Sequence, residues 1–209
     1  MRSNIDLIKD SIECLSGKWS DVIPTFFFYG ILIQVFGEFF KLFLGFGPFQ
    51  RSVFDLAYFA LTGPMSIGII IYSLAVVNNQ NFSFNQLFKP YDNYLNTIGL
   101  IFVLAVIIIG GFILFIVPGI IISLIYSMAP YVLAEEPEIS IGDALKKSSE
   151  LTKGYRTKLF LLGLIYAGLT IISVFTLFIG LIWLIPLFGI TSANFYNDLK
   201  SSKRLKKIS

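Results

Sequence analysis

Histidine is absent from this chain of 209 residues, and cysteine occurs once, as Cys14. A single cysteine excludes a disulfide within the chain, and metal cages of imidazole and thiolate groups are excluded as well. The sequence also lacks a nucleophile elbow, a phosphate-binding loop and a dinucleotide fingerprint. We therefore expect a protein that is not an enzyme and that uses no metal or cofactor; an intramembrane enzyme built on carboxylates is the remaining catalytic alternative.

Charged residues are scarce, at 14% of the chain, where an ordinary soluble domain has about 25%. Hydrophobic residues make up 56% and aromatic residues 16%, and the mean hydropathy is +0.78. This composition is typical of a membrane protein. The net charge of +3 is small, and the basic residues lie beside apolar segments instead of among stacking aromatics. This pattern argues against a nucleic-acid partner and favours anionic lipid headgroups.

Long stretches without charge predict where the chain crosses a membrane, because an ionised side chain at the bilayer centre costs about 2.5 to 3.5 kcal/mol. Two such stretches, 93–134 and 159–197, are about twice as long as one crossing needs and must fold back on themselves. We place the reversals near Pro118–Gly119 and near Gly180. The predicted class is an all-α, polytopic helical membrane protein with six membrane helices, at about 22–44, 54–77, 94–116, 118–134, 158–178 and 180–198.

The ends of the chain are polar. Residues 1–21 predict an amphipathic cytoplasmic segment, and because they are mostly polar we expect no cleavable signal peptide. Residues 22–198 form the predicted membrane bundle, which includes a cytoplasmic amphipathic helix at about 140–154, and residues 199–209 form a basic cytoplasmic tail. We treat the whole chain, 1–209, as a single membrane domain.

Lysine and arginine predict the orientation. If the six helices alternate in direction, all of the 16 basic residues except Lys41 and Arg51 fall on one side of the membrane. Positive residues concentrate on the cytoplasmic side. Both termini are therefore expected in the cytoplasm.

Two internal similarities predict a repeat. "PMSIGIIIYSLA", from Pro64, matches "PGIIISLIYSMA", from Pro118, and "DLIKDSIECLSGKW", from Asp6, matches "DALKKSSELTKGYR", from Asp143. The predicted unit is a surface helix followed by two membrane helices, used three times. In the third surface helix, Ser140 is expected to cap the helix together with Asp143.

Three acids, Glu135, Glu136 and Glu138, follow the fourth predicted membrane helix. They can form a cation site or serve as turn and capping residues. The matching positions of the other copy are asparagines. This difference favours the structural interpretation.

A second set of candidates is a polar strip on the first membrane helix, formed by Gln34, Glu38 and Lys41. The spacing places all three on one helical face. Such a strip can face the bundle interior and serve transport or gating. Alternatively, Lys41 extends to the outer boundary and pairs with Glu38.

Prolines within or beside the apolar runs are candidate helix breaks. Broken helices form binding sites in transporters, but proline kinks also simply allow helices to pack. The four candidates are Pro64, Pro118, Pro130 and Pro186. A further set of residues is predicted to contact lipid from the amphipathic segments: Trp19, Lys146, Lys147, Lys153 and Tyr155.

Two longer stretches resemble a known family. They are "VPGIIISLIYSMAPYVLAEEPEISIGDALKKSSELTKGYRTKLFLLGL", from Val117, and "WLIPLFGITSANFYNDLK", from Trp183. Both are similar to the uncharacterised bacterial integral membrane family called domain of unknown function nine-seventy-five. "PLFG" at Pro186 departs from the proline-tyrosine pair that is common in the family. The resemblance implies a multi-pass protein of the bacterial inner (plasma) membrane and implies no activity.

These observations lead to two functional hypotheses. The first is a non-enzymatic scaffold, lipid-contacting protein or accessory subunit of a membrane complex, with anionic lipid and a membrane protein partner or a second copy of the chain as its contacts. The alternative is a small transporter or channel that uses the proline-broken helices and the Gln34 strip.

Overall fold

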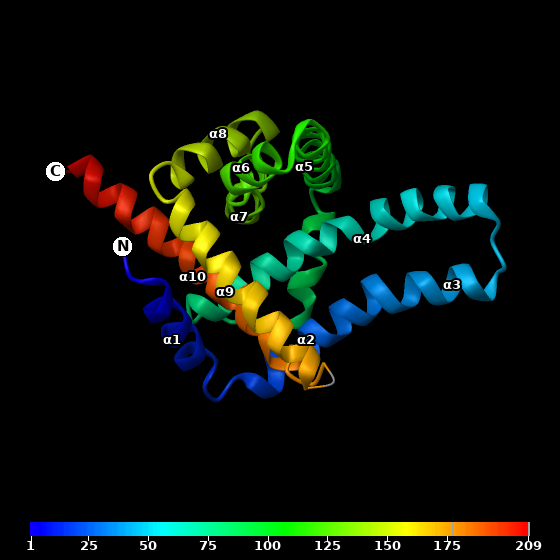
Figure 1. The fold of residues 1–209 in the computed structure, drawn as a ribbon, viewed down its shortest axis with the longest axis horizontal. Coiled ribbons are helices and arrows are strands. Elements are labelled where there is room, and N and C mark those ends of the chain that lie inside the picture. Colours follow the sequence, from blue (N-terminus) through cyan, green and yellow to red (C-terminus); the bar gives the residue numbers. More distant parts are fainter. Residues whose placement is uncertain (177, 209) are drawn as a thin grey trace.

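The chain folds entirely into helices and turns, with no strand in the part that the structure describes. The computed structural model describes residues 1–176 and 178–208, without the side chains of 34–36 and 205–208. Figure 1 shows the order of the elements. The α-helices are α1 (Asn4–Leu15), α2 (Trp19–Gly30), α3 (Gly37–Phe43), α4 (Pro48–Val77), α5 (Tyr94–Leu114), α6 (Ile116–Tyr126), α7 (Ala129–Glu135), α8 (Ile141–Thr152), α9 (Arg156–Phe175) and α10 (Leu181–Ile208). A π-helical segment, η1 (Ile31–Phe36), joins α2 to α3, and two short 3₁₀ turns, η2 (Phe84–Leu87) and η3 (Lys89–Tyr91), lie between α4 and α5.

Five helical runs are long and apolar enough to cross a membrane. They are Trp19–Phe43, Pro48–Val77, Tyr94–Leu114, Ile116–Glu135 and Arg156–Phe175. Both ends of each run lie within a few residues of the ends of a span predicted from the sequence. The exception is the start of α4, which lies six residues earlier than expected. The sixth predicted span lies in α10, which is not among the five.

The membrane-type helices form antiparallel pairs. α2, η1 and α3 pair with α4, α5 pairs with α6, and α9 pairs with α10. Figure 1 shows the first pair as a long arm that projects away from the other helices. The arm's inner end is held by α4, which packs against both α7 and α10. Large apolar side chains are exposed at the helix turns, including Phe115 at 77% and Phe175 at 84%. This exposure suits contact with lipid better than contact with water.

The reversal between α5 and α6 is tighter than the sequence indicated. We expected it at Pro118–Gly119, but a single extended residue, Phe115, separates the two helices. Pro118 lies in the first turn of α6, where the missing N–H has no helical partner to lose. The close approach is possible because Gly111 and Gly119 face each other, and a Cβ on Gly111 would lie 3.1 Å from Gly119 Cα.

The surface helices α1 and α8 begin in the same way. Ser3 precedes α1 and accepts a hydrogen bond from the Asp6 amide at 3.1 Å. Ser140 precedes α8 and accepts one from the Asp143 amide at 3.1 Å. The capping pair predicted for Ser140 and Asp143 is thus present. Each cap satisfies an amide that the first helical turn leaves without a partner.

The two surface helices also end alike. Each is 12 residues long, and each is followed by a glycine in the left-handed region, Gly17 at φ 77° and Gly154 at φ 86°. The next helix begins two residues later, at Trp19 and at Arg156. The chain therefore turns from surface helix to membrane-type helix through the same local geometry in both places.

The middle surface segment differs from the prediction. A third amphipathic helix was expected after α4, but the chain forms only η2 and η3. Pro90 explains the difference, because proline has no N–H for the carbonyl of Gln86 and its ring clashes with that carbonyl in an α-helix. The prediction of a third surface α-helix was wrong for this segment.

Two of the candidate helix breaks lie inside continuous helices. Pro64 is within α4 and Pro186 within α10, whereas Pro130 is the second residue of α7. Pro64 leaves the carbonyl of Ala60 without its usual amide donor. The hydroxyl of Tyr94, at the start of α5, donates to this carbonyl at 3.0 Å. A neighbouring helix thus compensates for the proline.

We predict that Tyr94→Phe lowers the free energy of unfolding by about 1 kcal/mol, because it leaves the Ala60 carbonyl without a donor. The measurement is thermal unfolding of the purified protein in detergent. In a Pro64→Ala background the new amide can bond to Ala60, so Tyr94→Phe should then cost much less. An equal loss in both backgrounds would show that the hydroxyl does not act by replacing the proline's missing donor.

Candidate functional site

The interruption between α6 and α7 is covered by α8. Pro130 prevents the helix from continuing, and the carbonyl of Ile125 accepts hydrogen bonds from Ser148 Oγ at 2.8 Å and Thr152 Oγ1 at 3.2 Å. Ser148 Oγ in turn accepts from the amide of Met128 at 3.2 Å. Since Ser148 and Thr152 are almost fully buried, α8 is fixed against the membrane-type helices by polar bonds.

The buried face of α8 consists of small residues at a spacing of four, Ala144, Ser148 and Thr152. This face packs against α6 and α7. Lys146 and Lys147 are exposed on the rest of the helix. α8 therefore contacts protein with one face, and its lysines are exposed on the other. The sequence pattern alone did not show whether the apolar face contacts protein or lipid.

The three acids at the end of α7 and just after it each have a partner. Glu135 Oε2 accepts from the Tyr196 hydroxyl at 2.7 Å and from Lys200 Nζ at 2.5 Å. Glu136 accepts from Lys147 Nζ at 2.6 and 2.9 Å. These contacts join α7 to α8 and to α10.

The third acid, Glu138, accepts from Asn93 Nδ2 at 2.6 Å and so joins the segment before α8 to the start of α5. Among the residues described, no group of three or more acids, cysteines or histidines can hold a metal ion. These contacts favour the structural interpretation of Glu135, Glu136 and Glu138 over the cation site.

A groove of about 460 Å³ lies beside these contacts, where α7, α8 and α10 meet. Four lysines and three glutamates contribute to its walls: Lys147, Lys153, Lys200, Lys203, Glu135, Glu136 and Glu150. Because Glu135 and Glu136 are paired with Lys200 and Lys147, the rest of the groove has a positive excess. Groups of this kind, held in a concave site, can bind an anion such as a lipid phosphate.

Two lipid-contact candidates are packed into the protein. Tyr155 is half-buried against the core beneath Lys203, whose Nζ lies 5.8 Å from the ring centre. Trp19 is half-buried beside Val22 and Phe26 at the start of α2. Lys153 is exposed at the end of α8. Of the five candidates, the three lysines are therefore the ones that the structure leaves most accessible.

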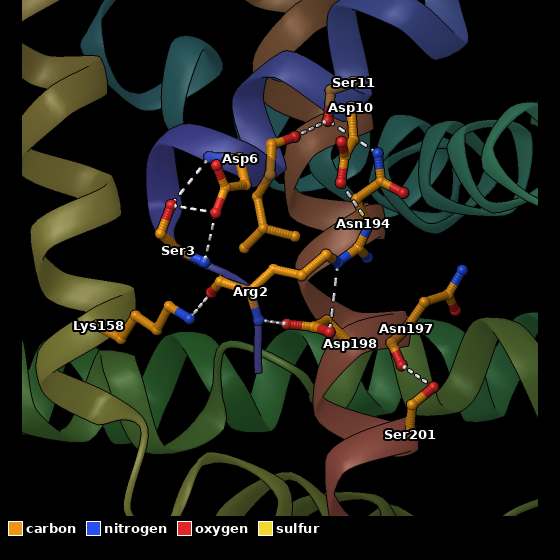
Figure 2. Close-up of polar contacts among 11 residues, drawn as sticks. Arg2, Ser3, Asp6, Asp10, Ser11, Lys158, Asn194, Asn197, Asp198 and Ser201 are labelled. Atoms are coloured by element: carbon orange, nitrogen blue, oxygen red, sulfur yellow. Dashed lines mark hydrogen bonds and ion pairs between the residues drawn. The ribbon is translucent and has the colours of Figure 1, made fainter.

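A second polar cluster joins the beginning of the chain to its end. Figure 2 shows Arg2 between Asp10 of α1 and Asp198 of α10. Arg2 Nη1 lies 2.5 Å from Asp10 Oδ2, and the Arg2 amide donates to Asp198 Oδ2 at 3.1 Å. Lys158 Nζ, at the start of α9, donates to the Arg2 carbonyl. α1, α9 and α10 are thus linked at their polar ends.

A buried pair extends this cluster into the bundle. Asn194 Nδ2 of α10 donates to Ser11 Oγ at 2.8 Å, and Ser11 is fully buried. The residues Arg2, Ser11 and Asp198 were not among the sequence candidates. Nothing in the sequence pairs them, since Arg2 and Asp198 are 196 positions apart. The only indication of such a contact in the sequence was a polar residue, Ser11, on the apolar face of α1.

The polar strip lies on the arm. Lys41 Nζ is 2.5 Å from Glu38 Oε1 and 2.8 Å from Asp55 Oδ1 of α4. The ion pair expected between Glu38 and Lys41 is present, and Asp55 is an additional partner. The side chain of Gln34 lies outside the described residues. The two described members therefore join α3 to α4 near the outer turn of the arm.

These features define a class of protein: an all-helical chain of the membrane type, built from antiparallel pairs of apolar helices with charged contacts near their ends. The family model described as "Protein of unknown function (DUF975)" matches residues 91–203, more than half of the chain. The chain belongs to this family, as the resemblance seen in the sequence implied. No curated protein and no solved structure gave a match.

We predict that Ser148→Ala lowers the free energy of unfolding by about 1 to 3 kcal/mol, because it leaves the buried Met128 amide without a partner and removes one of the two hydroxyl donors to the Ile125 carbonyl. Ser149→Ala is the matched control on the neighbouring, less buried position and should change stability by less than about 0.5 kcal/mol. Thermal unfolding in detergent measures both. Equal effects of the two substitutions would contradict the role given to Ser148 in fixing α8.

Proposed function

We propose that the chain is a non-enzymatic, multi-pass protein of the bacterial inner membrane with six crossings and both termini in the cytoplasm. The contact between Arg2 and Asp198 supports an even number of crossings. Residues in direct contact must be on the same side, so the five apolar runs between them require one further crossing. The sixth span predicted from the sequence, at about 180–198 and antiparallel to α9, supplies it in α10.

We also propose that the bundle consists of three related units, each a surface segment followed by two membrane helices. The matching caps, lengths and glycine turns of α1 and α8 support the relation between the first and third units. In the middle unit, "NNQNFSFNQLFK", from Asn78, aligns with "EEPEISIGDALK", from Glu135. This alignment places Leu87 of η2 opposite Ala144, and both are fully buried. The middle unit would then have shortened its surface helix at Pro90.

The proposed role is to bind anionic lipid at the cytoplasmic end, as a scaffold or accessory subunit beside a membrane protein partner or a second copy of the chain. The observation that carries it is the lysine-rich groove between α7, α8 and α10. Two of its glutamates, Glu135 and Glu136, are occupied by Tyr196, Lys200 and Lys147, which favours a binding surface over acid–base catalysis. The contacts of Lys41 with Glu38 and Asp55 likewise favour a structural role for the strip over the transporter alternative.

We predict that the double variant Lys153→Glu/Lys203→Glu retains less phosphatidylglycerol than the unchanged protein, by about thirtyfold, if each lysine contributes about 1 kcal/mol near the surface. Both lysines line the groove, and neither side chain takes part in the ion pairs found among the described residues. The measurement is native mass spectrometry of the protein after delipidation and titration with the lipid in detergent.

Arg51→Glu is the charge control for this experiment, since Arg51 lies at the outer end of the arm and on the opposite side of the proposed membrane. It should leave retention of phosphatidylglycerol unchanged. The proposal fails if the double variant retains this lipid as the unchanged protein does, or if Arg51→Glu weakens retention equally.

The proposed orientation can be tested at Cys14, but the surroundings of this thiol are expected to slow its reaction. Cys14 is half-buried, its Sγ lies 3.5 Å from the Val76 carbonyl, and burial raises the pKa of the thiol. Less thiolate is then present at neutral pH. We predict that a Cys14→Ser/Glu13→Cys variant, with an exposed thiol one residue away, reacts several-fold faster with a membrane-impermeant maleimide in opened cells.

In intact cells neither thiol should react. Labelling of the Glu13→Cys thiol before the cells are opened would place the N-terminal segment outside and overturn the orientation. Equal rates for the two thiols in opened cells would contradict the shielded position of Cys14.

A further inference from the structure

A cavity of about 720 Å³ lies between the start of α2, the second half of α4 and the loop that follows α4. It is distinct from the lysine-rich groove and shares none of its residues. Four aromatic side chains line it, from three separate segments: Phe28, Tyr72, Phe82 and Phe84. Phe28 and Phe84 meet edge to face with ring centres 4.8 Å apart, and Tyr72 and Phe82 do so at 5.6 Å.

The only charged side chain in the lining is that of Asp21. The backbone carbonyl of Asp21 accepts from Thr25 Oγ1 at 2.8 Å and from the Tyr72 hydroxyl at 3.2 Å. These bonds fix the turn that carries the carboxylate. No ion pair found within the described residues uses this carboxylate, which is on an exposed residue.

The cavity lies at the level where lipid headgroups are expected. The first membrane-type run begins at Trp19, two residues before Asp21, and the second ends at Val77, before Phe82 and Phe84. The cavity thus begins at the polar end of both runs. Its lining on α2 runs from Ser20 to Phe28, so the cavity extends about 12 Å along this helix toward the apolar region.

We propose that this cavity binds the ammonium group of a zwitterionic phospholipid, such as phosphatidylethanolamine. The faces of aromatic rings attract cations, and rings gathered around an ammonium group are a known way to bind it. The carboxylate of Asp21 supplies the counter-charge, whereas an anionic headgroup would meet an uncompensated negative group there. The inference rests on the proposed membrane placement.

A contact at the edge of the cavity supports the same chemistry. Lys18 Nζ lies 5.9 Å from the centre of the Phe82 ring. This ammonium is already held outside the lining by Asn79 Oδ1 at 2.8 Å. Phe82 thus already has a cation near its ring, while the cavity itself has no basic residue in its lining.

The test is native mass spectrometry of the delipidated full-length protein, titrated in detergent with dioleoyl phosphatidylethanolamine or phosphatidylglycerol. Asp21→Asn should weaken retention of phosphatidylethanolamine by about tenfold, and Phe84→Leu by about three- to tenfold. Both residues are exposed enough for the variants to fold, and thermal unfolding checks this. The matched controls, Asp92→Asn and Phe49→Leu, remove the same groups elsewhere and should have no effect.

Soluble phosphoethanolamine is tested separately as a competitor. It should compete only weakly, because it lacks the acyl chains that place the headgroup at the cavity. The inference is overturned if Asp21→Asn and Phe84→Leu retain phosphatidylethanolamine as the unchanged protein does. It is also overturned if Asp21→Asn weakens retention of both lipids equally. Failure of the lysine groove would appear differently, as retention of phosphatidylglycerol that does not respond to Lys153→Glu/Lys203→Glu.

Discussion

The fold depends on one constraint: backbone carbonyls that lose their helical donors must find others, because apolar surroundings offer no water. The chain meets it with hydroxyl groups from neighbouring helices. Tyr94 donates to the Ala60 carbonyl that Pro64 leaves without a donor, and Ser148 donates to the Ile125 carbonyl beside the break before α7. In the π-helical segment η1, the Tyr58 hydroxyl donates to the carbonyl of Leu32. Each of these three irregularities therefore requires a particular neighbouring side chain. The packing of the helices depends on these individual bonds as well as on buried apolar area.

The same bonds connect the fold to both candidate sites. α8 carries lysines to the groove between α7 and α10, and Ser148 and Thr152 hold the helix in place. At the aromatic cavity, the Tyr72 hydroxyl bonds to the backbone of the turn that carries Asp21. In each case the group proposed to meet a ligand is exposed, while the hydroxyl of a buried residue fixes the backbone nearby. The binding surfaces can therefore change in sequence without loss of the helix packing beneath them.

Much of the helical framework could be predicted from the sequence, because runs without charge mark apolar helices and capping serines mark surface helices. The ends of α5 and α9 fall within three residues of their predicted positions. The missing surface helix after α4 was not foreseen, since its apolar pattern was satisfactory and one residue, Pro90, decided the outcome. Contacts across long distances were also out of reach. Asp55 as the second partner of Lys41, and Tyr196 as the partner of Glu135, depend on which helices lie side by side, and periodicity within one helix does not contain that information.

The link between Arg2 and Asp198 has a consequence for how the protein is made. The two residues are separated by 196 positions, and a chain emerges from the ribosome in order, at about 5 to 20 residues per second. The N-terminal helix is therefore complete many seconds before α10 exists to receive it. During that interval Ser11, Asp10 and Arg2 lack their final surroundings and remain at the membrane surface. The N-terminal helix would thus dock last although it is synthesised first, and the arrival of α10 would mark the completion of the bundle.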